Sequence, residues 1–359
     1  MSDVNAEAPA AEPQVPPPPK SAVKRRAGGY AALVAAGILL SRVAGLIRTR
    51  AITHFLGTSL AADAFAVAQK VPNVMQNLLG EGVLSASFIP VYARLIAKGD
   101  EKVAGRIAGV FVSMLTVFVT AVVLLGIVFA RPLIKLTAWG LDGPVLELSV
   151  TLTRIIFPGV GILVVSAWCL GVLNTHRQFF LSYIAPVLWN VAQIAVLVVL
   201  GAKLAKRELS VALAWGLVVG CVLQLVVQLP FVFKHAKHLS FGLERGLEPV
   251  QTIFRQLGPA VGGRGVVQIS SYVDQFIASF LPQGALARLL YAQTIYMLPV
   301  SVFGMSVAAA ELPQMAGQTG SDEEIHRNLR QRLDRGIRQI AFFIIPTTIA
   351  FVVLGRLIV

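Results

Sequence analysis

Residues 41–90 read SRVAGLIRTRAITHFLGTSLAADAFAVAQKVPNVMQNLLGEGVLSASFIP, and here charged and polar side chains interrupt a sequence that is otherwise strongly apolar. The apolar runs around them are long enough to cross a bilayer. Ionisable groups at membrane depth are costly unless they face the interior of a helix bundle or a water-filled cavity. The stretch therefore predicts the wall of a polar cavity inside a membrane protein.

Helical periodicity places the first polar residues on one stripe. An α-helix turns by about 100° per residue. Ser41, Gly45 and Arg48 therefore share one face of the first helix. Arg42 lies one step round from this stripe, whereas Arg50 points to the opposite side.

A second stripe is expected on the next helix. Its polar members fall within about 40° of one another on an ideal helix, and they are Asp63, Lys70, Asn77 and Glu81. Pro72 removes a backbone donor and the pair Gly80 and Gly82 loosens the backbone, so we expect this helix to be distorted. Two adjacent helices would then line the cavity.

The composition is that of a polytopic membrane protein. Of 359 residues, 56% are hydrophobic and 14% are charged, whereas soluble domains carry roughly 25% charged residues. The formal net charge is +13, but the basic residues cluster in short loops between apolar runs. That clustering is typical of membrane topology, so no nucleic-acid partner is predicted.

The apolar runs predict an all-α fold with about nine transmembrane helices. The expected spans are residues 28–56, 60–95, 103–130, 147–174, 178–202, 208–233, 250–281, 285–314 and 326–359. Residues 1–27, with their proline-rich run, predict a disordered cytoplasmic tail. A cytoplasmic N-terminus puts most Lys and Arg in cytoplasmic loops, as the positive-inside rule requires.

An internal echo divides the chain into two lobes. Residues 87–93, SFIPVYA, resemble residues 310–316, AELPQMA, and Pro90 and Pro313 are 223 residues apart. This offset predicts a parallel repeat, which is a known plan of transporters. We therefore expect a complete first lobe of six helices at 28–240 and a partial second lobe at 241–359. A full repeat would require further spans, so the sequence looks C-terminally incomplete.

The sequence predicts a binding site without catalytic chemistry. Cys169 and Cys221 stand alone in apolar runs, and no nucleophile motif or phosphate-binding loop is present. Arg264 lies in the middle of a span, where the repeat offset matches it to Ser41. Four cations would then converge on one cavity, partly balanced by Asp63 and Glu81, and they are Arg42, Arg48, Lys70 and Arg264. Guanidinium groups favour phosphate or carboxylate, so an anionic substrate is expected.

Several motifs together closely resemble the MurJ (MviN) lipid II flippase family. They are SRVAGLIR at 41–48, ADAF at 62–65, KVPN at 70–73, GEG at 80–82, SFIP at 87–90, LAWG at 213–216 and LQLVVQLP at 223–230. The resemblance covers residues 30–359. It implies the fold of the multidrug/oligosaccharidyl-lipid/polysaccharide (MOP) flippase superfamily, and a transporter rather than an enzyme. It also implies export of undecaprenyl-pyrophosphate-linked peptidoglycan precursor across the bacterial cytoplasmic (inner) membrane.

The resemblance also implies where the substrate binds. It places Ser41, Arg42, Arg48, Asp63 and Glu81 at the central cavity, to which the charge argument adds Lys70, Asn77 and Arg264. Many relatives carry an Arg-Arg pair where this chain has Gln76-Asn77, and an arginine where it has Thr294. Arg264 is expected to replace a lost charge.

The expected partners are lipid II and membrane lipids. No bound cofactor is expected, and the energy would come from a coupling ion or the membrane potential. Two alternatives stay open, namely a cation-coupled exporter of drugs or other lipid-linked oligosaccharides in the same superfamily, and a membrane scaffold that transports nothing. A drug exporter would prefer an acidic, aromatic-lined cavity, and buried charges would be a needless liability in a scaffold.

Overall fold

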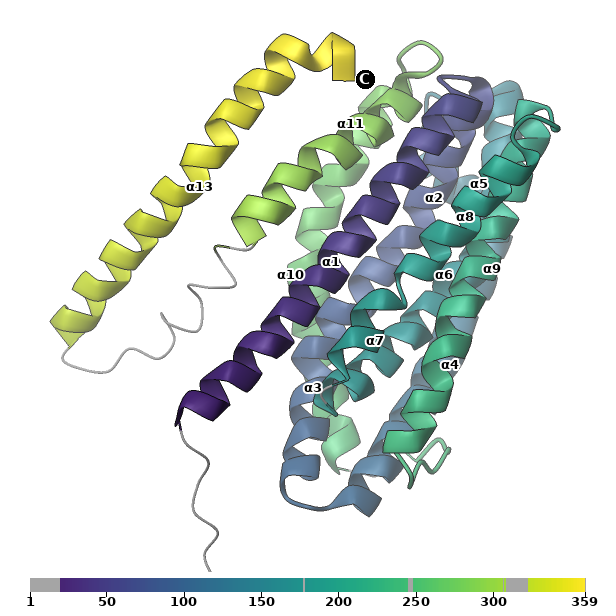
Figure 1. Ribbon diagram of the computed structural model, residues 1–359. Helices are drawn as coiled ribbons and strands as arrows, with labels where there is room; N and C mark the ends of the chain where they lie inside the picture. The colour runs from purple at the N-terminus through teal and green to yellow at the C-terminus, as the bar shows by residue number, and fades with distance from the viewer. Residues whose placement is uncertain (1–19, 177, 245–247, 306, 308–321, 359) are drawn as a thin grey trace, which may run out of the picture.

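The computed structural model describes residues 20–176, 178–244, 248–305, 307 and 322–358, and every regular element in these ranges is helical (Figure 1). The helices are α1 (Lys20–Leu56), α2 (Leu60–Leu79), α3 (Glu81–Ala97), α4 (Glu101–Val128), α5 (Ala130–Thr137), α6 (Gly143–Thr175), α7 (Phe179–Ile184), α8 (Val187–Leu200), α9 (Lys206–His235), α10 (Glu248–Ala278), α11 (Ala285–Pro299), the π-helical turn η1 (Val300–Met305) and α13 (Asp322–Ile358). The predicted all-α fold is confirmed. We call α1–α9 the first lobe and α10–α13 the second lobe.

Two of the expected spans are interrupted. Residues 60–95 form α2 and α3, because α2 ends at Gly80, whose N–H donates to the Gln76 carbonyl at 2.7 Å. A Cβ at Gly80 would lie 2.2 Å from that oxygen, so the break requires glycine. Residues 178–202 likewise divide into α7 and α8 before Pro186, which lacks an N–H.

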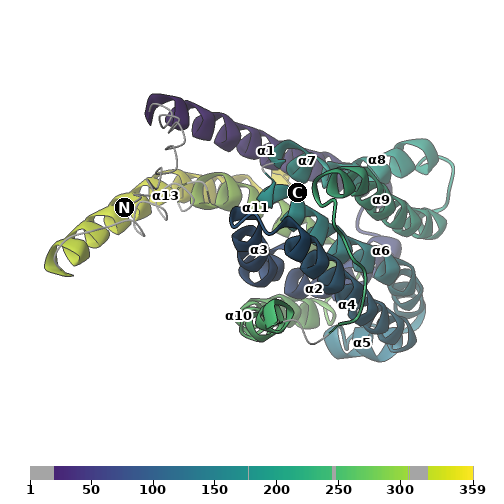
Figure 2. The ribbon, with the colours of Figure 1, turned by 90° about the horizontal axis from the view of Figure 1, so that it is seen from below.

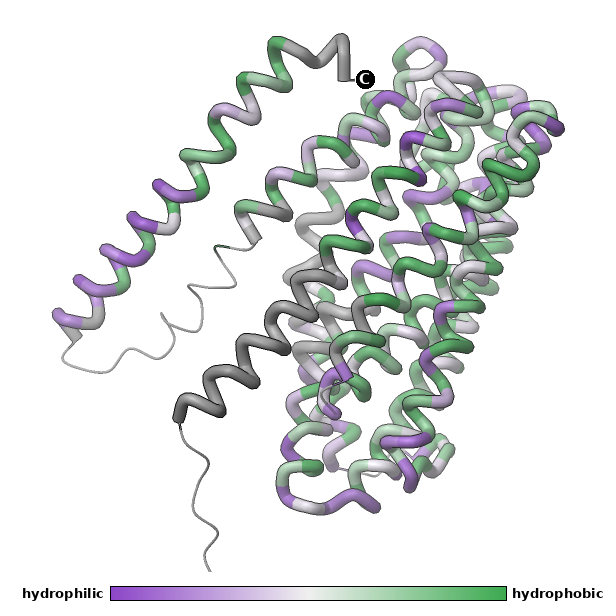
Figure 3. The backbone as a smooth tube through the Cα atoms, in the orientation of Figure 1, coloured by the Kyte–Doolittle hydropathy of each residue, from purple (hydrophilic) through white to green (hydrophobic). Residues whose placement is uncertain are grey.

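Four of the described helical segments are long and apolar enough to cross a membrane, namely α4, α6, α9 and residues 326–353 of α13. This finding covers the described residues alone, so the total of about nine spans stays a prediction. α6 is the central helix, packing against α9, α2, α3 and α4. In α13 the first half is hydrophilic and the second half apolar, as Figure 3 shows.

A buried hydrogen-bond chain fixes how α6 and α9 pack. The Ser166 hydroxyl donates to Gln228 Oε1 at 2.6 Å, and Gln224 Nε2 donates to Ser166 Oγ at 2.8 Å. All three side chains are buried. Such bonds stabilise the contact between apolar helices, because separating the helices would leave these polar groups unpaired in hydrocarbon. The chain therefore helps to hold α6 and α9 together inside the first lobe.

The segment that leaves α9 runs along α4 before the second lobe begins (Figure 2). A Cβ at Gly105 would lie 2.5 Å from the His238 carbonyl oxygen, and one at Gly109 would lie 2.3 Å from that of Ser240. Arg106, between these glycines, forms an ion pair with Glu244. We call residues 236–244 the strap. Its close contact with α4 makes it part of the surface of the first lobe.

The two lobes follow similar helix boundaries at the offset of the sequence echo. A shift of 223 residues would carry the end of α1 to residue 279, and α10 ends at Ala278. The same shift would carry the start of α2 to residue 283, and α11 begins at Ala285. The second copy of the echo, residues 310–316, lies outside the described residues. α1 and α11 contact each other, so the first and second lobes meet there.

A basic cavity between α1, α8 and α11

The first polar stripe faces a cavity of about 340 Å³ between three helices. α1 contributes Ser41, Arg42, Gly45, Leu46 and Arg48; α8 contributes Trp189 and Asn190; α11 contributes Leu290, Gln293, Thr294, Met297 and Leu298. α1 is continuous through this region, so its helical spacing brings the polar stripe and Arg42 to the same wall. Among the described residues of this lining, the two arginines are the only charged side chains, which makes the cavity basic.

Arg48 is held against an aromatic ring. Its Cζ lies 4.5 Å from the centroid of the Trp189 ring, within the range of a cation–π interaction. Its Nε and Nη1 are buried and have no hydrogen-bond partner among the described residues. Within the same part of the chain, Asn190 Oδ1, beside Trp189 on α8, is also buried without a partner. The cavity wall thus carries hydrogen-bonding capacity that the protein leaves unused.

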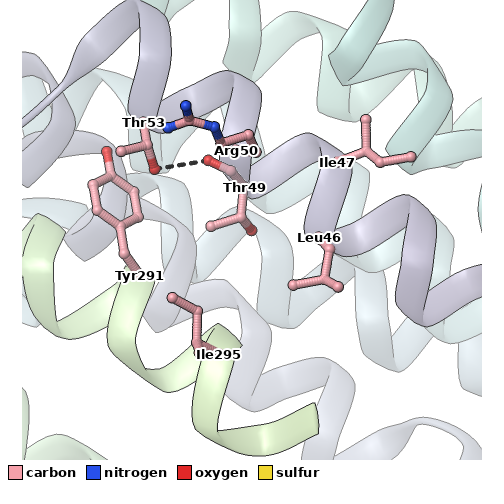
Figure 4. A pocket seen from close by; sticks show the side chains of 7 residues that line it. All are labelled: Leu46, Ile47, Thr49, Arg50, Thr53, Tyr291 and Ile295. Carbon is pink, nitrogen blue, oxygen red and sulfur yellow. Dashed lines mark hydrogen bonds between the residues drawn. The ribbon is translucent and has the colours of Figure 1, made fainter. Parts of the chain in front are cut away.

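A second cavity of about 350 Å³ lies on the other side of the contact between α1 and α11 (Figure 4). Its lining consists of three aliphatic side chains, Leu46, Ile47 and Ile295, together with Thr49, Arg50, Thr53 and Tyr291. Thr53 donates to the Thr49 carbonyl at 2.9 Å, which is the dashed line in the figure. Leu46 belongs to both linings. Arg48 and Arg50 therefore face different cavities, as their helical phases predict.

Asp63 lies in neither of these linings but at a contact between the lobes. Its side chain is 4% exposed. Oδ2 accepts from the N–H of Gly284 at 2.5 Å and Oδ1 from that of Ala287 at 2.8 Å, so the carboxylate caps the N-terminus of α11. A negative charge is favourable there, because the first N–H groups of a helix lack partners within it.

Further contacts join the lobes at the same end of the bundle. The Tyr291 hydroxyl donates to the Gly57 carbonyl at 2.8 Å. Gly284 has φ +92°, and a Cβ there would lie 2.8 Å from Thr58 Cβ, so the turn before α11 needs glycine. Just after α10, Ser279 Oγ accepts from the Gly140 N–H at 3.0 Å. The lobes are thus closed against each other at the end that carries residues 57–59 and 279–284.

The remaining candidate residues are spread over other places. Lys70 lines a separate space of about 20 Å³ next to Gln275 and Gln293. Asn77 is exposed near the end of α2. Glu81 begins α3, after the break at Gly80, so its place on the α2 stripe no longer follows from helical periodicity and stays a prediction. Arg264 lies within α10, and the side chains of Glu81 and Arg264 are outside the described part of the structure.

The sequence analysis missed Trp189 and Asn190. The sequence feature that could have indicated them is a Trp-Asn pair inside an apolar span, but tryptophan is also common at the membrane–water interface. The contact that gives Trp189 its place joins α8 to α1, about 140 residues earlier in the chain.

Comparison with known proteins identifies the family. A family model described as lipid II flippase MurJ matches residues 52–359. The chain belongs to this family. Its relatives include the lipid II flippase MurJ of Burkholderia cenocepacia, 33% identical over 327 residues, covering 89% of this chain and 63% of the relative. The probable lipid II flippase MurJ of Haemophilus influenzae is 31% identical over 332 residues, covering 89% of this chain and 64% of the relative. These relatives are named as transporters rather than enzymes.

The chain spans between 54% and 64% of the length of such curated relatives. Among solved structures, a lipid II flippase MurJ in an inward closed conformation aligns with a TM-score of 0.75 and 23% identity, covering 90% of this chain and 65% of that one. An inward-facing MATE multidrug resistance transporter of the MOP superfamily aligns with a TM-score of 0.68 and 19% identity, covering 88% and 70%. These likenesses confirm the predicted fold.

Proposed function

We propose that this protein moves lipid II, an undecaprenyl-pyrophosphate-linked peptidoglycan precursor, from the inner to the outer leaflet of the bacterial cytoplasmic membrane. The observation that carries the proposal is the basic cavity, where Arg42 and Arg48 share a wall with neutral polar side chains of α8 and α11. Family membership supports the substrate class, since the matching relatives are named lipid II flippases.

The chemistry of the cavity suits a pyrophosphate head group. A flippase must shield that group, with its sugars and peptide, while the lipid tail stays in the bilayer. Guanidinium groups match phosphate oxygens in geometry and remain charged, so they offset the desolvation of the anion. A drug exporter for cations would place acids here instead. No covalent step is needed, and the side chains only bind and release.

The contact between the lobes suggests how access alternates. In our proposal the end that carries Asp63 is the outer end, and the structure corresponds to a state closed toward the outside. Opening requires the carboxylate to leave the N–H groups of Gly284 and Ala287, after which the lobes rock about the cavity. A coupling ion or the membrane potential supplies the energy; one elementary charge crossing 100 mV corresponds to about 2.3 kcal/mol.

Arg264 completes the proposed site. We propose that it supplies the cationic contact that Thr294 and Gln76-Asn77 do not. Arg264→Ala should weaken lipid II binding, Arg264→Lys should rescue only partly because lysine loses the two-pronged geometry, and Arg264→Ala with Thr294→Arg should restore binding. Normal binding and growth with Arg264→Ala alone would make this arginine structural.

The proposed function is tested in cells and with purified protein, using the polypeptide that the whole gene encodes. It should restore growth to bacteria depleted of their own lipid II flippase. Purified protein should bind lipid II, measured by native mass spectrometry, more tightly than undecaprenol of equal chain length. Growth without lipid II binding, or binding of cationic drugs in its place, would refute the proposal.

Orientation is tested by thiol labelling. We propose a cytoplasmic N-terminus and an outer loop at residues 203–207, since basic residues concentrate on the other side. Single cysteines replace Ser21 or Glu208 in a background without Cys169 and Cys221. An impermeant maleimide on intact cells should label position 208 and spare position 21; the reverse pattern would overturn the orientation.

A further inference from the structure

Trp189 has a direct relation to the arginine that faces the basic cavity. Its ring centroid lies 4.5 Å from Arg48 Cζ, and both residues line the same cavity. The face of an indole ring attracts a cation because of its quadrupole, and tryptophan does so best among the aromatic side chains. The Arg48 guanidinium on α1 is thus held against α8 by a cation–π contact with the Trp189 ring.

The packing of α8 on α9 fixes the backbone at Trp189. A Cβ at Gly220 of α9 would lie 2.5 Å from the Cα of Trp189, so the two backbones approach closely there. The next residue, Asn190, is 2% exposed and donates to the Pro186 carbonyl at 3.3 Å. Trp189 is therefore presented from a closely packed wall of the first lobe.

An aromatic partner leaves the hydrogen-bond donors of Arg48 unused. A carboxylate would hold the guanidinium by accepting its N–H bonds and would neutralise it. The ring attracts the charge without accepting those bonds, and no residue that the structure describes accepts a hydrogen bond from Arg48 Nε or Nη1. Buried donors without partners are unfavourable, so an anion that reaches them gains more than it would from donors already bonded.

We propose that Trp189 is a positioning residue that holds Arg48 ready for the phosphate oxygens of a polyprenyl pyrophosphate. The inference rests on the proposed function and extends it to α8, which the charged motifs do not identify. Because Trp189 packs against Gly220, the packing of α8 on α9 determines the position of the Arg48 guanidinium. Binding affinity should then depend on this ring only while Arg48 is present.

The test compares Trp189→Leu and Trp189→Phe with the wild type, in the protein as its gene encodes it. Trp215→Leu is the matched control, because Trp215 lies on α9, is 55% exposed and does not line the cavity. The probe is undecaprenyl pyrophosphate in detergent, with undecaprenol as the neutral comparison. We expect binding about tenfold weaker with Trp189→Leu, equivalent to about 1.4 kcal/mol, partial rescue with Trp189→Phe, and no change with Trp215→Leu.

A double-mutant cycle separates positioning from general packing. In an Arg48→Gln background, Trp189→Leu should cause no further loss of affinity. An equal loss in both backgrounds, or wild-type affinity of Trp189→Leu, would overturn the proposal. If Arg48→Gln itself binds undecaprenyl pyrophosphate as the wild type does, the basic site of the proposed function fails first, which is a distinguishable result.

Fluorescence gives a readout if Trp189→Leu does not fold. Undecaprenyl pyrophosphate should change the tryptophan emission of the wild type, because the guanidinium above the ring changes partners on binding. The change should vanish in Trp189→Phe and in Arg48→Gln, and undecaprenol should not produce it. An emission change that persists in Trp189→Phe would assign the signal to another tryptophan and would overturn the contact.

Discussion

Replacing Asp63 by asparagine should open the closed end of the bundle. The carboxylate accepts two backbone N–H bonds, from Gly284 and Ala287, while 4% exposed. Asparagine keeps one acceptor oxygen and turns an NH₂ group toward the second donor. The loss combines one hydrogen bond to a charged group, about 1.5–3 kcal/mol, with a buried unpaired donor, about 1–3 kcal/mol. A net change of about 3 kcal/mol shifts the equilibrium between closed and open states roughly a hundredfold.

The assay measures the exposure of a residue at this contact. Ser279 is 5% exposed in the closed state; Ser279→Cys is nearly isosteric, and the background lacks Cys169 and Cys221. The rate of labelling by an impermeant maleimide reports the open fraction, so it should rise by up to about a hundredfold with Asp63→Asn. Asp142→Asn is the control, since the exposed pair of Asp142 with Lys135 makes the same chemical change nearly neutral.

An unchanged labelling rate in Asp63→Asn, in protein that still unfolds cooperatively, would refute the role of this carboxylate in closure. An equal increase with Asp142→Asn would also refute it, because it would point to loss of net charge instead of loss of the two specific hydrogen bonds.

Two further predictions compare matched residues. Arg48→Ala should abolish growth in flippase-depleted cells while Arg50→Ala supports it, because Arg48 faces the basic cavity and Arg50 does not; equal tolerance would contradict the stripe argument. Gly109→Ala should lower the stability of the purified protein by about 1–3 kcal/mol, since its Cβ would meet the strap. In contrast, a Cβ at Gly262 would meet no atom of the described residues within 4 Å, so Gly262→Ala should be neutral or stabilising. Thermal unfolding measures the second pair, and similar melting temperatures for the two variants would contradict the close contact.

The sequence predicted best where a helix is continuous. The stripe of Ser41, Gly45 and Arg48 follows from helical phase alone, and α1 preserves that phase from Lys20 to Leu56. The same reasoning does not extend to Glu81, because a backbone break at Gly80 separates it from Asp63 and Lys70. Helical periodicity predicts which residues share a face only within one continuous, hydrogen-bonded helix.

Contacts that depend on tertiary structure could not be predicted from the sequence. Asp63 looked like one member of a basic and acidic stripe, but its partners are backbone N–H groups, which every residue except proline has. Trp189 carries no charge and lies in an apolar span, so its relation to Arg48 became visible only when α8 was placed beside α1.

The strap determines where this chain can be divided. Since residues 236–244 lie against Gly105 and Gly109, a fragment that ends at His235 would expose two bare backbone surfaces on α4 and lose the partner of Arg106. A fragment that ends after Glu244 would keep the strap, which packs against Gly105 and Gly109. Reassembly of the protein from two separately expressed halves should therefore succeed with a cut between Glu244 and Glu248 and fail with one at the end of α9, and the same rule governs where a reporter domain can be inserted.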